Sequence, residues 1–236
     1  MKPILITQHI PADGPAHFTD YLTRHHIPFE LCRIYAGDDI PANVNAYAGL
    51  SILGGPMSVN DELPWIALEL TLIQDALARQ VPVIGHCLGG QLLSKALGGH
   101  ITTSPYPEIG WSDIRPANPA ITREWFAGAN PARLFQWHGE TFSLPTDAEL
   151  IAIGRYCPNQ AYLVDGRHLG MQFHCEVDET KILNWIDTCQ TDIATASHSP
   201  AVQSSDDIRA SLPTALPVSK QLADAIYDRW LQGINR

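Results

Sequence analysis

The sequence predicts an α/β fold: an open, mostly parallel sheet with helices on both faces, in the flavodoxin-like three-layer arrangement. In the first hundred residues, short apolar runs alternate with helix-like segments, which is typical of a parallel sheet covered by helices. From about residue 100, short strands separated by Pro, Gly, Asn and Asp indicate antiparallel strands added to one edge of the sheet. A C-terminal helical extension completes the expected architecture.

The first part of the chain contains the expected parallel strands and their helices. The segment 64–79 begins with proline, which suits the first turn of a helix, and carries one apolar face. A second helix is expected over 15–26. The strands are expected over 3–7, 29–34, 49–53 and 81–85.

In the second part of the chain, the sequence predicts a hairpin and a final strand. Asp165 and Gly166 suit a tight hairpin turn, and the strand that follows, 169–173, leads directly into His174. A helix is expected over 178–189. The other short strands are expected over 101–103, 110–115, 134–137, 150–154 and 161–164.

The C-terminal part predicts a linker and one helix. Thr191 to Pro217 is rich in Ser, Ala, Asp and Pro, so we expect a loop or poorly ordered linker with at most short helical turns. A last helix is expected over 219–231, where apolar residues recur every four positions. We therefore divide the chain into a domain over 1–190 and, over 191–236, a linker plus a helix that packs on this domain or on a partner.

Composition limits the classes of function. The 236 residues suffice for one substantial core, and Asp plus Glu outnumber Lys plus Arg by 25 to 15. Because the basic residues are scattered, we expect no nucleic-acid partner. No segment suits a signal peptide or a membrane span, so we expect a cytoplasmic protein without membrane contact. The five cysteines lack CxxC spacing, so neither a disulfide framework nor a metal site is expected.

Cys87 is the strongest candidate nucleophile. An apolar run ends in Gly85-His86-Cys87-Leu88-Gly89 and passes directly into a helical pattern, so the thiol lies where a strand turns sharply into a helix. Glycine is needed two residues before and after the thiol, because a Cβ there would collide with the crossing backbones. At the helix N-terminus the amide dipoles favour the thiolate, which is the form that attacks a carbonyl.

His174 and Glu176 can supply a base and the group that orients it. Residues i and i+2 of an extended segment point to the same face, so Glu176 can lie beside the imidazole of His174 while Cys175 points away. The carboxylate would fix the tautomer of the imidazole and stabilise the imidazolium. A surface ion pair is the alternative interpretation. His138 is the competing base, which we interpret as a pocket or structural residue.

An attack on a carbonyl also needs donors for the oxyanion. One candidate is the backbone amide of Leu88, directly after the nucleophile. The second is expected in the glycine-rich loop Gly54-Gly55-Pro56 at the end of the third strand, with Gly55 as the donor. That loop taken alone is also compatible with a plain turn.

The chain thus carries three motifs in a fixed order. They are the Gly54-Gly55-Pro56 loop, the elbow GxCxGxQ that ends at Gln91, and the HxE pair of His174 and Glu176. Together they resemble class I, or triad-type, glutamine amidotransferases, and the resemblance spans about residues 1–190. The longer stretches ILGGPMSVND, EIGW, WHGETF and MQFHCE resemble the stand-alone branch related to the amidotransferase domain of GMP synthase.

The resemblance implies a thiol hydrolase without a cofactor. The thiolate of Cys87 would attack the γ-amide of glutamine or of a γ-glutamyl compound, and water would release glutamate from a thioester. Gln91, with the backbone near Gly139 and Glu140, would hold the amino-acid end of this small-molecule substrate. Ammonia would be used by a separate synthetase chain or simply released.

Two neighbours of the nucleophile depart from the family pattern. Gly90 stands where synthase-linked members often have His, and His86 stands where apolar residues are common. We expect these two positions to influence the choice of substrate.

Three alternatives remain open from the sequence. The first is a γ-glutamyl peptidase that acts alone, and the second is a non-catalytic regulatory module of the same fold. The third is a cysteine enzyme of the related fold group that contains peptidases and chaperone-like proteins. The HxE pair on the last strand, with the GGP loop upstream, favours the amidotransferase.

Overall fold

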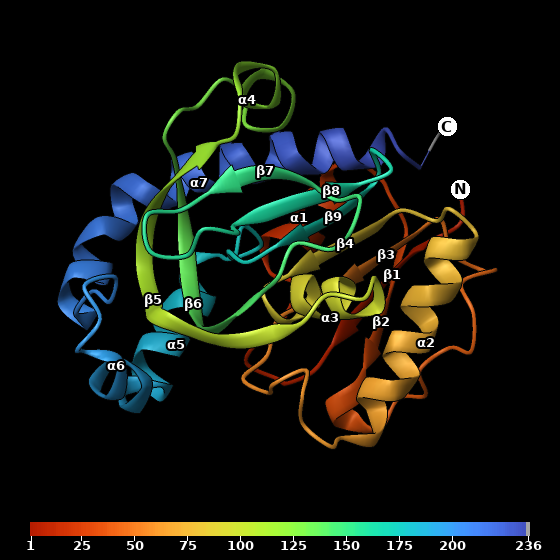
Figure 1. Ribbon diagram of the computed structural model, residues 1–236, viewed down its shortest axis with the longest axis horizontal. Coiled ribbons are helices and arrows are strands. Elements are labelled where there is room, and N and C mark those ends of the chain that lie inside the picture. The colour runs from red at the N-terminus through yellow and green to blue at the C-terminus, as the bar shows by residue number, and fades with distance from the viewer. Residues whose placement is uncertain (235–236) are drawn as a thin grey trace.

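A computed structural model describes residues 1–234, and within them one sheet of nine strands forms the centre of the molecule (Figure 1). The strands lie in the order β2 (Phe29–Arg33), β1 (Ile4–Gln8), β3 (Gly49–Ile52), β4 (Val83–His86), β9 (His168–Met171), β8 (Ala161–Val164), β7 (Glu149–Ile153), β5 (Ile101–Pro116) and β6 (Ala132–Phe142).

The strand directions confirm the predicted fold class. β2, β1, β3, β4 and β9 are parallel, in the flavodoxin-like order, and β8, β7, β5 and β6 add antiparallel strands on one side. In open α/β sheets, ligands bind outside the carboxyl ends of the parallel strands. The ends of β1, β3, β4 and β9 therefore mark the expected site.

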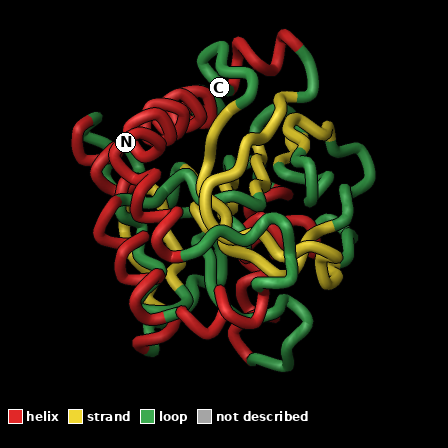
Figure 2. Tube along the Cα trace, turned by 90° about the vertical axis from the view of Figure 1, so that its left-hand side faces the viewer, coloured by secondary structure: helices red, strands yellow, loops and turns green. Residues whose placement is uncertain are grey.

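Helices cover both faces of the sheet (Figures 1 and 2). On one face, α1 (His17–Arg24), α4 (Pro119–Trp125) and α7 (Ser205–Leu231) bury their apolar side chains against the strands. On the other face, α2 (Pro64–Ala78) and α3 (Leu88–Ala96) do the same. The chain ends lie close together, since Met1 and Ile234 line one shallow hollow.

β5 and β6 form a long antiparallel arm that extends the sheet. The prediction of two separate strands over 101–103 and 110–115 is wrong, because β5 is continuous and accommodates the intervening residues by a shift of register between Thr103 and Glu108. The arm packs with α5 (Glu179–Thr188) and the first half of α7 in a third apolar cluster.

The expectation of a linker over Thr191 to Pro217 is wrong. This segment contains α6 (Gln190–Ala196) and the first half of α7, which continues through Pro213 and Pro217. Proline and serine content obscured a four-residue apolar spacing, in which Ile208, Leu212 and Leu216 face the third cluster. Tertiary packing outweighs the unfavourable helix propensity of the two prolines.

Within residues 1–234, no helix combines the length and the apolar character that a membrane crossing needs.

Candidate active site

Cys87 occupies a strained strand-to-helix turn. It follows β4 directly and serves as the N-cap of α3, with φ 49° and ψ −106°, a conformation that non-glycine residues rarely adopt. A Cβ on Gly85 would overlap the backbone of Gly89, and a Cβ on Gly89 would overlap the carbonyl of Ile52. The predicted need for both glycines is therefore confirmed, and the turn presents the thiol at the carboxyl end of β4.

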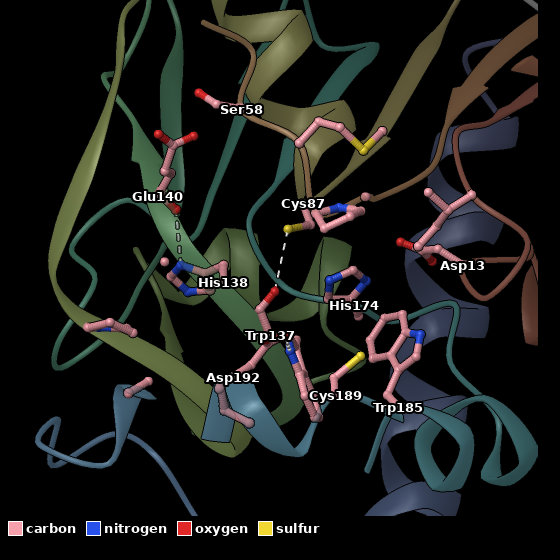
Figure 3. A pocket seen from close by; sticks show the side chains of 18 of the residues that line it. Asp13, Ser58, Cys87, Trp137, His138, Glu140, His174, Trp185, Cys189 and Asp192 are labelled. Atoms are coloured by element: carbon pink, nitrogen blue, oxygen red, sulfur yellow. Dashed lines mark hydrogen bonds between the residues drawn. The ribbon is translucent and has the colours of Figure 1, made fainter. Parts of the chain in front are cut away.

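The thiol of Cys87 lines a cavity of about 610 Å³ (Figure 3). Its Sγ lies 3.8 Å from the carbonyl oxygen of Trp137 and 3.6 Å from Nε2 of Gln172, which donates to it. Cys87 is 5% exposed and lines this cavity, so a ligand in the cavity lies against it. His174, Gly55, Gln91, Gly139 and Glu140 also line the cavity.

His174 lies between the thiol and a buried carboxylate. Its Nδ1 is 2.7 Å from Oε1 of Glu176, and its ring packs edge-on against Trp185. Burial alone would lower the pKa of His174, but the charge of Glu176 and the neighbouring Cys87 raise it to about 10. The imidazolium form of His174 is thus favoured at neutral pH, next to the thiol. Cys175 points away, as expected, and meets Tyr227 of α7.

A buried lysine supports this carboxylate, and the sequence pattern did not indicate it. Lys181 on α5 donates from Nζ to Glu176 Oε1 and to the carbonyl of Gly14, at 2.8 Å each, and it also pairs with Asp13. Burial disfavours a charged Glu176, but the charges of Lys181 and His174 hold its pKa well below the usual range. A local sequence pattern cannot predict the contact between Lys181 and Asp13, because the two residues are far apart in the sequence.

The two residues predicted to supply oxyanion donors are neighbours in the structure. Leu88 is the first residue of α3, and Gly55 is close enough that a Cβ on it would lie 3.1 Å from the Leu88 side chain. Among the described residues, neither backbone N–H donates a hydrogen bond to another protein group. Both are therefore available to a ligand beside Cys87.

Gln91 lies at the base of the cavity. Its Nε2 donates to the carbonyl oxygen of Glu140 at 3.1 Å and to Oε1 of Gln172 at 3.4 Å. The structure thus brings Gln91 together with Gly139 and Glu140, the three residues expected to hold the amino-acid end of a substrate.

His138 is engaged elsewhere, as we expected for a structural or pocket residue. Its Nε2 lies 3.0 Å from Oε2 of Glu108 and its Nδ1 lies 3.1 Å from the carbonyl oxygen of Glu140 (Figure 3). Both ring nitrogens therefore have protein partners. Glu108 also accepts from Gln160 at 2.7 Å.

The two positions that depart from the family pattern lie outside the cavity. His86 is fully buried, its pKa is lowered to about 4 by burial, and its Nε2 lies 3.4 Å from the Tyr227 hydroxyl of α7. A Cβ on Gly90 would overlap the carbonyl oxygen of Met171 on β9. Packing explains both residues, so the expectation that they influence substrate choice is not supported.

The C-terminal part of the chain supplies one wall of the cavity. Cys189, Asp192, Thr195 and Ala196, on and beside α6, line the cavity. Figure 3 shows Cys189 and Asp192 on the side opposite Cys87. Trp137 donates from its indole Nε1 to Oδ2 of Asp192 at 3.2 Å, which joins this wall to β6. Sequence reasoning missed this wall, because the segment was expected to be a linker.

Comparisons with known proteins show the family to which the chain belongs. Residues 18–186 match the family model described as "Glutamine amidotransferase class-I". The chain is 30% identical over 184 residues to the "Putative glutamine amidotransferase-like protein YfeJ" of Salmonella typhimurium, covering 75% of this chain and 77% of that protein. It is 29% identical to the GMP synthase of Porphyromonas gingivalis over 167 residues, which are 67% of this chain but 31% of that longer protein.

The similarity extends to solved structures. The crystal structure of a glutamine amido transferase from Methylobacillus flagellatus superposes with a TM-score of 0.95 at 41% identity, covering 99% of this chain and 95% of that one. A glutamine amidotransferase structure from Thermotoga maritima, at 24% identity and a TM-score of 0.86, shares the fold. The chain therefore belongs to the class-I glutamine amidotransferases, a family of enzymes that hydrolyse the side-chain amide of glutamine.

Proposed function

We propose that this protein hydrolyses the γ-amide of glutamine or of a γ-glutamyl compound through Cys87, His174 and Glu176. The observation that carries the proposal is that the strained thiol and His174 line one cavity, with Glu176 hydrogen-bonded to the far side of the imidazole. Membership of the amidotransferase family supports the choice of an amide substrate.

The first half of the reaction forms a thioester. The thiolate of Cys87 attacks the γ-carbonyl carbon, and the resulting oxyanion accepts hydrogen bonds from the backbone N–H groups of Gly55 and Leu88. The imidazolium of His174 then donates its proton to the leaving nitrogen. The C–N bond breaks, and ammonia or an amine leaves with this proton while the γ-glutamyl group stays on sulfur.

The second half returns the enzyme to its starting form. His174, now neutral, takes a proton from water, and the hydroxide attacks the thioester carbonyl. The C–S bond breaks, glutamate leaves, and Cys87 is again a thiolate beside an imidazolium. Glu176 keeps the imidazole oriented throughout, and Lys181 holds Glu176.

Glutamate release from glutamine tests this proposal. We expect turnover by the wild-type protein and its loss in Cys87→Ala, with a γ-glutamyl thioester on Cys87 detectable by mass spectrometry after rapid quenching. Cys32→Ala is the matched control, because this buried thiol lies on the edge strand β2, away from the cavity. Absence of Cys87-dependent hydrolysis of glutamine and of all γ-glutamyl amides tested would sink the proposal.

A second candidate, a γ-glutamyl amide hydrolase that acts alone, is favoured by the size of the cavity. Cavities of roughly 300–1,000 Å³ hold drug-sized ligands, so 610 Å³ leaves room beside a γ-glutamyl group for a larger leaving amine. Among the lining residues the structure describes, Asp13, Asp61, Glu140 and Asp192 are acidic and none is Lys or Arg. Asp13 is paired with the buried Lys181, so Asp61, Glu140 and Asp192 carry the charge without that partner. We therefore expect γ-glutamyl amides with a cationic leaving amine to be cleaved faster than anionic ones of equal length.

The substrate panel separates the two candidates. A kcat/KM for γ-glutamyl amides well above that for glutamine favours the peptidase-like function, and the reverse order favours an ammonia-producing enzyme. Asp192→Asn should reduce the preference for cationic amines, because it removes the charge of the α6 wall and keeps its shape.

For an ammonia-producing enzyme, we propose a separate synthetase chain as the ammonia acceptor. The support is that GMP synthase relatives are longer than the region they share with this chain. Glutamine hydrolysis that rises on addition of the synthetase would support a subunit, and full activity without it would count against one.

A further inference from the structure

A further buried histidine–carboxylate pair lies beneath the predicted oxyanion loop. His9 directly follows the last residue of β1. Glu69 lies within α2, one of the helices that cover the sheet. Their side chains are fully buried, and His9 Nε2 lies 2.8 Å from Glu69 Oε2. The other ring nitrogen, Nδ1, lies 3.0 Å from the carbonyl oxygen of Gly54.

The surroundings favour the imidazolium form of His9. Both ring nitrogens face acceptors, so both can donate. Burial would lower the pKa of His9, but the Glu69 carboxylate and the Gly54 carbonyl raise it above the ordinary value. Trp65 packs against the ring, with centroids 4.9 Å apart. A buried ion pair adds little stability compared with apolar packing, so stability alone does not explain this pair.

The bond to Gly54 controls the direction of the next N–H. In a trans peptide the carbonyl and the following N–H point in opposite directions, and the Gly54–Gly55 peptide is trans. Since His9 binds the Gly54 oxygen on one side, the Gly55 N–H points to the other side, where Gly55 lines the cavity next to Leu88. A peptide between two glycines rotates at little steric cost, so its direction needs an external hold.

No side chain of the loop itself can hold the Gly54–Gly55 peptide in place, because there is no room for a side chain at Gly54. A Cβ on Gly54 would overlap Asp13 and would lie 2.8 Å from Cε1 of His174. Rotation of the peptide would turn the Gly54 carbonyl oxygen toward the place where the substrate oxyanion forms, and the two oxygens would repel each other.

We propose that His9, held by Glu69, is a positioning residue that fixes the Gly54–Gly55 peptide with its N–H directed at the oxyanion. This role rests on the proposed function. It predicts that losing the bond from Nδ1 to Gly54 slows the acyl transfer without weakening ground-state binding.

Two double variants isolate this bond. In the background Glu69→Gln, which removes the charge of the pair, His9→Asn places an amide nitrogen at the position of Nδ1 and can donate to Gly54. His9→Gln places its amide at the position of Nε2, so it can pair with residue 69 but not with Gly54. Both variants are uncharged and differ chiefly in the bond under test.

We expect kcat of the His9→Gln variant to fall on the order of 10- to 100-fold, less than the roughly 10²–10³-fold loss caused by deleting an oxyanion donor. The His9→Asn variant should recover most of that loss. Inhibition by the product glutamate and alkylation of Cys87 by iodoacetamide, which forms no oxyanion, should be similar in both.

Other results would overturn either the positioning role of His9 or the proposed function. Equal kcat in the two double variants, or parallel losses in kcat, glutamate affinity and alkylation, would overturn the positioning role. Absence of turnover in the wild-type protein would overturn the proposed function and this role with it. His168→Asn is the control for loss of a buried histidine, because His168 begins β9 at the opposite end of the sheet. Its kcat should stay unchanged.

Discussion

At the residue scale, the site depends on residues whose backbone conformation or buried charge is energetically unfavourable. The backbone of Cys87 has a positive φ, and conformations of this kind cost on the order of 1–3 kcal/mol. Glu176 and Lys181 are charged and almost fully buried, which is tolerated because each has opposite charges beside it. Such costs indicate that the surrounding packing determines the position of the thiol and its base.

We expect the pKa of His174 to set the alkaline limit of activity. In the wild-type protein, Glu176 and Cys87 raise this pKa to about 10, so the acid that protonates the leaving nitrogen is lost only as the pH rises through about 10. Glu176→Gln removes one of these charges, and we expect the alkaline limb of kcat to move to lower pH. A pH profile of glutamate release measures this, and an unchanged alkaline limb would show that Glu176 does not govern the titration.

Replacement of the buried lysine should cost stability. Lys181→Met leaves Glu176 and Asp13 without a cation, and breaking a buried pair in this way typically costs about 3–5 kcal/mol. Urea unfolding at neutral pH measures the loss. Because the pKa of Glu176 is depressed in the folded protein, its stabilising effect disappears as the pH falls, and the difference between variant and wild type should shrink in acid.

Lys220→Met is the control for that experiment, because Lys220 lies on the partly exposed side of α7. A similar loss of stability in both variants would argue that the effect is not specific to the buried pair.

At the scale of elements, α3 is held close to the sheet by glycines that face strands. Gly89 approaches β3 and Gly90 approaches β9, both at distances that leave no room for a Cβ. This close approach places Leu88 at the start of the helix directly beside the oxyanion loop. The glycines thus connect a packing requirement to the geometry of the site.

Gly90→Ala tests this packing. The new Cβ would overlap the Met171 carbonyl, so the helix or the strand must shift, and overpacking of this kind typically costs about 1–3 kcal/mol. The midpoint of thermal or urea unfolding should fall accordingly. Gly139→Ala is the matched control for stability, because a Cβ on Gly139 would have no neighbouring atom within 4 Å. Equal stability of the two variants would contradict the inferred contact between α3 and β9.

At the scale of the whole molecule, α7 joins parts that the sequence had suggested were separate. Its first half packs with α5 and the β5–β6 arm, and its second half covers the parallel strands. Tyr227 reaches Cys175, the residue between His174 and Glu176. Asp224 and Asp228 bind side chains of α1. The C-terminal segment is therefore part of the core and also supplies one wall of the cavity.

A truncated chain tests this conclusion. Residues 1–190 lack Leu222, Ile226 and Trp230, which are buried in the main cluster, so we expect this fragment to aggregate or remain unfolded. Circular dichroism and size-exclusion chromatography measure the outcome. A monomeric fragment with a cooperative unfolding transition would instead support 1–190 as an independent domain.

The sequence determined those features that depend on neighbours along the chain. The alternation of strands and helices, the glycines around Cys87 and the i, i+2 spacing of His174 and Glu176 follow from local backbone geometry, and residues a few positions apart are enough to show them. The resemblance carried by the three motifs added the class of substrate. Only the second half of α7 was predicted, because the first half is rich in Ser, Ala, Asp and Pro and its few apolar residues pack on a surface made by distant parts of the chain.

Only the tertiary structure decided which distant residues meet. The contact of Lys181 with Asp13, the contact of His9 with Glu69, and the α6 wall of the cavity join residues far apart in the sequence. Such contacts depend on the order of the strands and on how helices cross them, which a local pattern does not contain. The candidate nucleophile was therefore visible in the sequence, whereas the groups that hold its candidate base and the predicted oxyanion loop in place were not.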